Sequence, residues 1–183
     1  MTNGISQSAD LTRRDMLAWT SAGAAALGAS TLFPIIDAKA QDMQNGADNF
    51  YTSDRVTLEK VGFQSQYRAK VAGNLFLPAN RDPAARLPAL IVGHPMGAVK
   101  EQSATLYATK MAEMGFAAMA IDLPFWGESE GAARQIVSPD VYAEAFSAAV
   151  DFLGTRPFID RARIGGIGIC GSGSFLISAA KID

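Results

Sequence analysis

Apolar and polar residues alternate in the first part of the chain for which a structure can be predicted. Residues 55–61 alternate in the way expected of a half-buried strand. Residues 67–77 are expected to pair with this run as an antiparallel neighbour. Pro78 closes this second run, and residues 80–83 indicate a turn. The pattern therefore predicts an antiparallel pair of strands.

After residue 87 the pattern changes to short, continuous apolar runs, which are typical of strands covered on both faces. Three such runs are predicted to be buried strands, at residues 88–92, 116–121 and 163–169. Helical periodicity lies between and after them, at residues 101–114, 139–153 and 175–181. Strands alternating with helices predict the α/β class, with a mostly parallel sheet and flanking helices.

The first forty residues follow neither strand nor core-helix spacing. Arg13 and Arg14 precede an apolar run rich in Ala and Gly at residues 17–36, and Ala38 and Ala40 then offer a small-x-small cleavage site. This resembles the twin-arginine signal peptide of an exported bacterial protein. The alternative is an uncleaved membrane anchor, because the run is nearly long enough to span a bilayer.

The resemblance to a signal peptide divides the chain into three consecutive segments. It predicts a signal peptide at 1–40, a flexible lead-in at 41–53 and a domain at 54–183. It also predicts a periplasmic or secreted protein that is exported by the twin-arginine machinery. Contact with a membrane is expected only through the signal peptide, during export.

Composition narrows the function classes. The 183 residues are about one domain long, and a net charge of −2 gives no reason to expect nucleic acid as a partner. One histidine and one cysteine, far apart in sequence, make a poor ligand set, so no metal site is expected. Glu128 and Glu130 are expected to form a solvated acidic pair in a loop.

The candidate chemistry lies at the end of the last predicted strand. In the segment Gly168-Ile-Cys170-Gly-Ser172, a nucleophile stands two residues from a small residue on each side. A sharp strand-to-helix turn demands this spacing, because larger side chains would collide there. Ser172, between Gly171 and Gly173, is the alternative nucleophile. Cys170 is preferred because the strand ends directly before it.

This segment resembles the nucleophile elbow of the α/β-hydrolase superfamily, especially its dienelactone-hydrolase-like branch, in which cysteine lies within G-x-C-x-G-G. The resemblance covers residues 55–183 and departs at Ser172, where that branch has glycine. It implies hydrolysis of an ester, lactone or related acyl bond of a small molecule, without a cofactor.

The resemblance also implies roles for two further loops. The backbone N–H groups of Met96 and Gly171 would hold the oxyanion. His94 and Gly97 would shape the loop that carries Met96, and His94 would orient that loop rather than act as the base. Asp122 would organise the loop after the next strand by accepting backbone N–H groups.

In this superfamily the acid and the histidine follow the nucleophile in chain order, yet only residues 171–183 follow Cys170. We therefore expect the first half of a hydrolase, truncated after the elbow helix and without triad-dependent turnover. One alternative is a non-catalytic exported binding protein. Another is a dinucleotide-binding oxidoreductase, since Gly166, Gly168 and Gly171 match G-x-G-x-x-G.

Overall fold

The computed structural model describes residues 51–182. The predicted signal peptide, with Arg13, Arg14, Ala38 and Ala40, lies outside the described residues, as does most of the predicted lead-in. None of the helices between residues 51 and 182 combines the length and the hydrophobicity needed to cross a bilayer.

The described residues form one sheet of five strands. The strands are β1 (Val56–Gln64), β2 (Lys70–Pro78), β3 (Leu87–Gly93), β4 (Ala117–Ile121) and β5 (Ile159–Gly168), in the spatial order β1-β2-β4-β3-β5. The first two strands pair antiparallel, as predicted, and β2 pairs antiparallel with β4. Strand β3 is parallel to both β4 and β5. The predicted α/β class with a mostly parallel sheet is confirmed.

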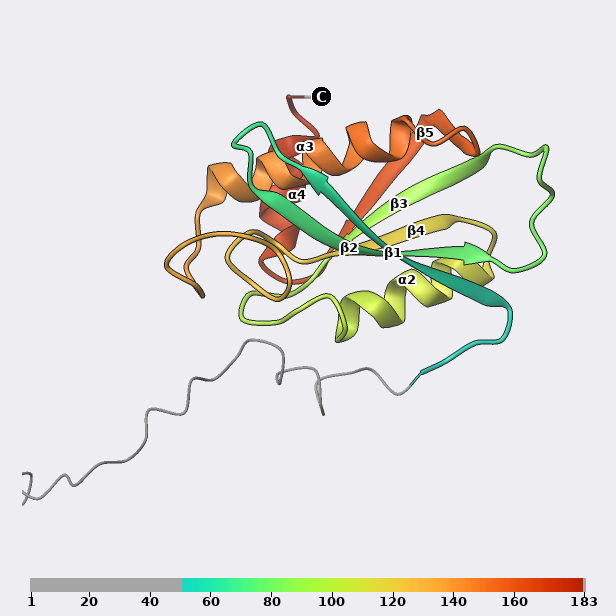
Figure 1. Cartoon of the computed structure of the whole chain (residues 1–183), viewed down its shortest axis with the longest axis horizontal. Helices are drawn as coiled ribbons and strands as arrows, with labels where there is room; N and C mark the ends of the chain where they lie inside the picture. The colour runs from blue at the N-terminus through green and yellow to red at the C-terminus, as the bar shows by residue number, and fades with distance from the viewer. Residues whose placement is uncertain (1–50, 183) are drawn as a thin grey trace, which may run out of the picture. The chain divides into compact units, whose positions relative to one another are not determined.

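Helices cover both faces of this sheet (Figure 1). They are α2 (Ser103–Glu113), α3 (Pro139–Gly154) and α4 (Ser172–Ala179). On one face, Leu75, Ile91 and Met119 of the strands pack in one cluster with Phe146 of α3 and Phe175 of α4. On the other face, small residues allow α2 to approach closely, and this cluster contains Phe76, Val92, Ala104, Ala108, Ala112, Ala118 and Ala120. Strands β3 and β4 are therefore largely buried on both sides, which explains their continuous apolar runs. The prediction of a third buried strand was wrong, because β5 lies at the edge of the sheet and most of its residues are exposed or half-buried.

The start of α4 differs from the sequence prediction. The helix begins at Ser172 rather than at residue 175. The chain turns so sharply after β5 that the Gly173 N–H already donates to the Cys170 carbonyl, at 3.1 Å. Gly and Ser are poor helix formers, so the sequence of this first turn concealed its helical conformation.

A short segment before β1 is fixed to the end of α2. The Tyr51 hydroxyl donates to Glu113 Oε1 at 2.6 Å, and the Arg55 guanidinium lies 3.1 Å from the same oxygen. The Lys110 ammonium lies 3.6 Å from the centre of the Tyr51 ring, as in a cation–π contact. The hydrogen bond from Tyr51 is the largest of several contacts that lower the pKa of Glu113 to about 2.

These contacts predict how the pKa of the Glu113 carboxyl group responds to the loss of the Tyr51 hydroxyl. Removing the hydroxyl by Tyr51→Phe should raise the pKa of Glu113 from about 2 towards its ordinary value, because the strongest hydrogen bond to the carboxylate is lost. In the wild type, the attachment should be complete above the ordinary pKa of glutamate and be lost as the pH falls through about 2. The carboxyl chemical shift of Glu113 measures both. Tyr67→Phe, at an exposed tyrosine, is the matched control. A wild-type midpoint at the ordinary value would contradict the prediction.

Candidate functional site

The turn between β5 and α4 holds Cys170 in a strained backbone conformation. Its φ is +56°, in the left-handed region that L-residues other than Gly, Asn and Asp rarely adopt. Its side chain is exposed, and the residue lies two positions after the end of β5 and two positions before the start of α4. Such strain persists only where the surrounding structure fixes it, and it is often found at reactive groups. The turn therefore presents a thiol above the carboxyl end of the sheet.

Close backbone contact accounts for the glycines around this turn. A Cβ atom on Gly168 would lie 2.5 Å from the Gly173 Cα and 2.6 Å from its nitrogen. A Cβ atom on Gly171 would lie 2.4 Å from Met96 Cγ. The two later glycines of the G-x-G-x-x-G match are thus explained by packing within the turn and against the loop after β3.

Ser172, the alternative nucleophile, is fully buried. Its hydroxyl donates to the backbone carbonyl of His94 at 2.5 Å, so it points into the protein rather than towards solvent. Gly93 makes room for it, because a Cβ atom there would lie 2.8 Å from both side-chain atoms of Ser172. Ser172 therefore joins the elbow to the loop that begins at His94, and its burial favours Cys170 as the group that meets a substrate.

The two expected oxyanion donors lie on segments that touch each other. The Met96 side chain packs against Gly171, which brings the loop after β3 to the start of α4. Within residues 51–182, neither the Met96 N–H nor the Gly171 N–H donates to a protein acceptor. Gly97, the next residue of the loop, has a φ of +78°, which favours glycine. Two adjacent segments thus leave backbone donors available beside Cys170.

His94 uses both ring nitrogens within the protein. Its Nδ1 donates to the Pro95 carbonyl at 2.7 Å, and its Nε2 accepts the Leu123 N–H at 3.0 Å. Burial lowers the pKa of His94, so the ring is neutral in this arrangement. The histidine connects the loop after β3 to the loop after β4, and neither nitrogen is available to take a proton from Cys170.

A buried ammonium group lies beneath the same two loops. Lys100 has no exposed surface, and its Nζ lies 2.7 Å from Asp122, 2.6 Å from Glu101 and 2.7 Å from Glu128. Burial alone would lower the pKa of Lys100, but the Asp122 carboxylate and the further hydrogen bonds raise it above its ordinary value. The lysine is therefore held charged in the interior.

Both carboxylate oxygens of Asp122 accept backbone hydrogen bonds that fix the loop after β4. Its Oδ1 accepts the Lys100 N–H at 2.8 Å, and its Oδ2 accepts the Glu128 N–H at 2.9 Å. Gly127, with a φ of +50°, approaches so closely that a Cβ atom would lie 2.2 Å from Asp122 Oδ2. The carboxylate thus accepts two backbone N–H groups and fixes the loop around itself.

Glu128 and Glu130 are both exposed, as expected of a solvated pair, but each also bonds within the protein. Glu128 pairs with Lys100, which lowers the pKa of the Glu128 carboxyl, and Glu130 accepts the Lys70 N–H at 2.8 Å. Sequence analysis missed Lys100 altogether, since a single lysine after a loop ordinarily indicates exposed surface. The three carboxylates around it lie within 4.8 Å of one another, a spacing that could suit a metal ion, but the lysine ammonium occupies their centre.

The buried ion cluster predicts a large effect of one substitution. Lys100→Met should lower the free energy of unfolding by about 3–5 kcal/mol, because it leaves the buried Asp122 carboxylate without a counter-ion. Lys60→Met is the matched control. Lys60 is exposed and pairs with Glu128 at 3.4 Å, so its loss should cost no more than about 1 kcal/mol. Urea unfolding monitored by circular dichroism measures both; equal losses would contradict the prediction.

The close approach of Gly168 to Gly173 predicts that two glycines of β5 differ in how much stability is lost on substitution by alanine. Gly168→Ala should destabilise the protein by about 2–3 kcal/mol, because the new methyl group meets backbone atoms of Gly173 that cannot move aside. Gly165→Ala, on the same strand, should change stability by less than about 1 kcal/mol. Its Cβ atom would lie an ordinary 3.4 Å from its only neighbour, Leu90 Cδ2. Thermal unfolding of both variants tests this, and a harmless Gly168→Ala would contradict it.

The chain was compared with protein families, with curated proteins and with solved structures. No family model matches the chain. An uncharacterized protein of Pseudomonas aeruginosa is 48% identical over 134 residues, which are 73% of this chain and 36% of that protein. Its crystal structure superposes with a TM-score of 0.72 over 74% of this chain and 42% of that chain. A protein of Aspergillus aculeatus described as thiohydrolase aneE is 34% identical over 131 residues, 72% of this chain and 40% of its own length.

A more distant likeness concerns the fold alone. The crystal structure of a dienelactone hydrolase-like promiscuous phosphotriesterase from metagenomic libraries superposes with a TM-score of 0.58 at 21% identity, over 70% of this chain and 55% of that chain. The chain spans about 36–40% of the length of the curated relatives named here. Its structural neighbours are α/β hydrolases, and residues 51–182 have the mostly parallel sheet and flanking helices of that fold.

Proposed function

We propose that this chain supplies the nucleophile and the oxyanion-binding groups of a hydrolase that acts on an ester, lactone or related acyl bond. The observation that carries the proposal is the turn at Cys170. An exposed thiol is held there at a φ of +56°, beside a loop and a helix start whose Met96 and Gly171 N–H groups have no acceptor within residues 51–182.

In the proposed reaction the sulfur of Cys170, as thiolate, attacks the carbonyl carbon of the acyl substrate. The carbonyl oxygen takes the electron pair, and the N–H groups of Met96 and Gly171 stabilise the negative charge. Collapse of this intermediate expels the alcohol oxygen, which takes up a proton, and leaves a thioester on Cys170. Attack of water on the thioester would then release the acid and return the thiol.

The second half of this reaction requires a base to activate water. His94 is the single histidine of the chain, and both its ring nitrogens are engaged with backbone groups. We therefore propose that the described residues carry out acylation and that a base outside them is required for turnover. By itself, this chain should stop at the acyl-enzyme.

Two further features support the proposal without testing it. The Aspergillus relative, 34% identical, is described as a thiohydrolase, which suits an acyl bond as the target. Arg13 and Arg14 ahead of an apolar run, with Ala38 and Ala40 at a cleavage site, support export through the twin-arginine machinery to the periplasm or beyond.

The proposal is tested by trapping the acyl-enzyme. The chain is treated with p-nitrophenyl acetate, and the modified residue is located by intact-mass and peptide mass spectrometry. We expect one acetyl group, on Cys170, added faster than to the same chain unfolded in urea, because only the folded turn aligns the thiol with the oxyanion donors.

Two variants separate the candidate nucleophiles. Cys170→Ala should abolish the modification. Ser172→Ala should retain it, since the buried Ser172 hydroxyl does not reach the substrate. An acetyl group on Ser172, or an equal rate for folded and unfolded chain, would refute the proposed role of the turn.

A further inference from the structure

The side chain of Met96 lies beside the turn at Cys170. A Cβ atom on Gly171 would lie 2.4 Å from Met96 Cγ, 3.1 Å from its Sδ and 3.6 Å from its Cβ. Three consecutive atoms of the methionine side chain therefore run along Gly171, which is the residue directly after Cys170. The thioether thus lies next to the peptide that carries the candidate nucleophile.

Packing in the core does not account for this position. Met96 is 51% exposed, and it belongs to neither hydrophobic cluster formed by the described residues. A Cβ atom on Gly97 would meet no atom within 4 Å, so the space beside the loop is open. Covering an exposed apolar side chain with an apolar group of a ligand is favourable, and methionine adapts readily to the shape of what covers it. The thioether therefore offers an apolar surface to a group bound at Cys170.

The proposed reaction fixes where a substrate meets this surface. The carbonyl oxygen lies between the N–H groups of Met96 and Gly171, and the carbonyl carbon becomes bonded to the sulfur of Cys170. The Met96 side chain extends from one of these two donor residues and contacts the other. An acyl chain that extends from the carbonyl carbon therefore lies within reach of the thioether.

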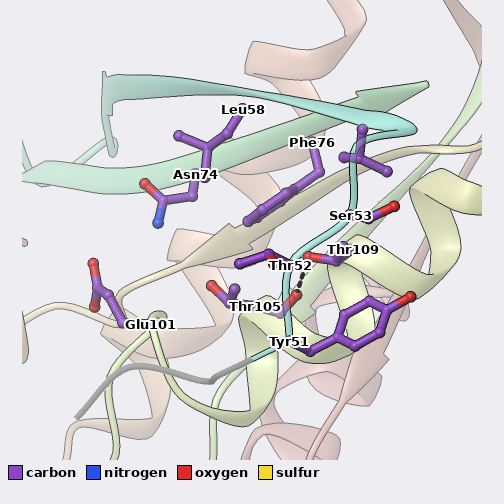
Figure 2. Close-up of a pocket in the computed structure, with 10 residues that line it drawn as sticks. Tyr51, Thr52, Ser53, Leu58, Asn74, Phe76, Glu101, Thr105 and Thr109 are labelled. Atoms are coloured by element: carbon purple, nitrogen blue, oxygen red, sulfur yellow. Dashed lines mark hydrogen bonds between the residues drawn. The ribbon is translucent and has the colours of Figure 1, made fainter. Parts of the chain in front are cut away.

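Two cavities elsewhere in the fold do not take this role. One, of about 320 Å³, lies between strands β1 and β2 and helix α2, and Figure 2 shows Phe76 on one side of it and Thr105 on the other. Another, of about 520 Å³, lies between β5, α3 and α4. Neither is lined by Cys170 or by a residue of the loop at 94–97. The apolar contact for a bound acyl group is therefore sought on the surface beside the turn, where Met96 lies.

We propose that the Met96 side chain selects substrates with an extended apolar acyl chain over those with an acetyl or a polar acyl group. This inference rests on the function proposed for Cys170 and names the class of its substrate. As the sulfur–carbon bond forms and the carbon–oxygen bond to the alcohol breaks, the thiol proton passes to solvent or to the departing alcohol. The acyl chain stays against Met96, and each methylene buried there favours the reaction by up to about fourfold.

The probes are the p-nitrophenyl esters of acetic, butanoic and methoxyacetic acids. The butanoyl and methoxyacetyl groups have equal length and differ by an oxygen in place of a methylene. The rate of acylation of Cys170 is measured from released nitrophenolate and intact mass, and it is divided by the rate for N-acetylcysteine to remove differences in intrinsic reactivity. We expect the normalised butanoyl-to-acetyl ratio to be about four to ten, since two methylenes are partly covered. The methoxyacetyl-to-acetyl ratio should be near one.

Substitutions of Met96 test the side chain. Met96→Ala removes the thioether but keeps the backbone N–H, so the ratio between two esters, rather than either rate, reports the side chain. The butanoyl-to-acetyl ratio should fall below about two. Met96→Leu restores an apolar side chain of similar volume and should retain most of the ratio. Met114→Ala, at an exposed methionine at the end of α2, is the matched control and should keep the wild-type rates and ratio.

The acyl-enzyme allows a direct measurement. In chain labelled with ¹³C at the methionine methyl groups, the methyl group of Met96 should show a nuclear Overhauser effect to the terminal methyl of the butanoyl group on Cys170. The methyl group of Met114 should show none, because Met114 lies at the end of α2.

The outcomes separate this inference from the proposed function. If no ester modifies Cys170 faster in the folded chain than in urea, the proposed function fails and the inference fails with it. If modification is faster but the normalised butanoyl-to-acetyl ratio is near one, or if Met96→Ala keeps the wild-type ratio, the inference alone is overturned. If Met96→Ala fails to fold, Met96→Gln decides in its place. Glutamine has a similar length and a polar end, so an unchanged ratio in that variant would equally exclude the role of the thioether.

Discussion

The buried ammonium of Lys100 is the interaction on which the arrangement of the site depends. Two loops follow parallel strands β3 and β4 and have no regular hydrogen-bond ladder between them. Lys100 comes from the first loop and Asp122 from the second, and their ion pair, with a second bond from the Lys100 N–H, joins the loops in the interior. His94 makes a further connection through the Leu123 N–H. A charge held without solvent is costly unless it is fully paired, so this pairing allows few alternative loop conformations. The Met96 N–H beside Cys170 lies on the first of these loops, so its position depends on this pairing.

Much of the fold followed from local patterns in the sequence. Alternation before Pro78 predicted the antiparallel pair, and continuous apolar runs correctly predicted β3 and β4 as buried strands. The third apolar run did form β5, but at the exposed edge of the sheet, because an apolar run does not show whether a further strand or helix covers it. The beginning of α4 at Ser172 did not follow, since its first turn consists of Gly and Ser. Lys100 did not follow either. Its role depends on the neighbouring Glu101 and on Asp122 and Glu128 of the loop after β4, and a contact between distant loops leaves no periodic pattern in the sequence.

The sequence alone could not decide which residue is the candidate nucleophile. Cys170 and Ser172 both stand among small residues, so spacing alone allowed either. The structure distinguishes them by backbone angle and burial, which are properties of three dimensions: one residue is strained and exposed, the other helical and enclosed. The oxyanion donors were placed by resemblance to a superfamily, and the contact between Met96 and Gly171 gives that placement a physical basis within this chain.

The contact of Gly93 with Ser172 limits how this site can change through evolution. A side chain at position 93 would meet Ser172 and also the Phe146 ring, whose Cζ would lie 2.4 Å from a new Cβ atom. A lineage that enlarged residue 93 first would pass through a protein with overlapping atoms, whereas one that first shortened residues 146 and 172 would not. The order of substitutions is therefore constrained, and three positions far apart in sequence are expected to change together or not at all.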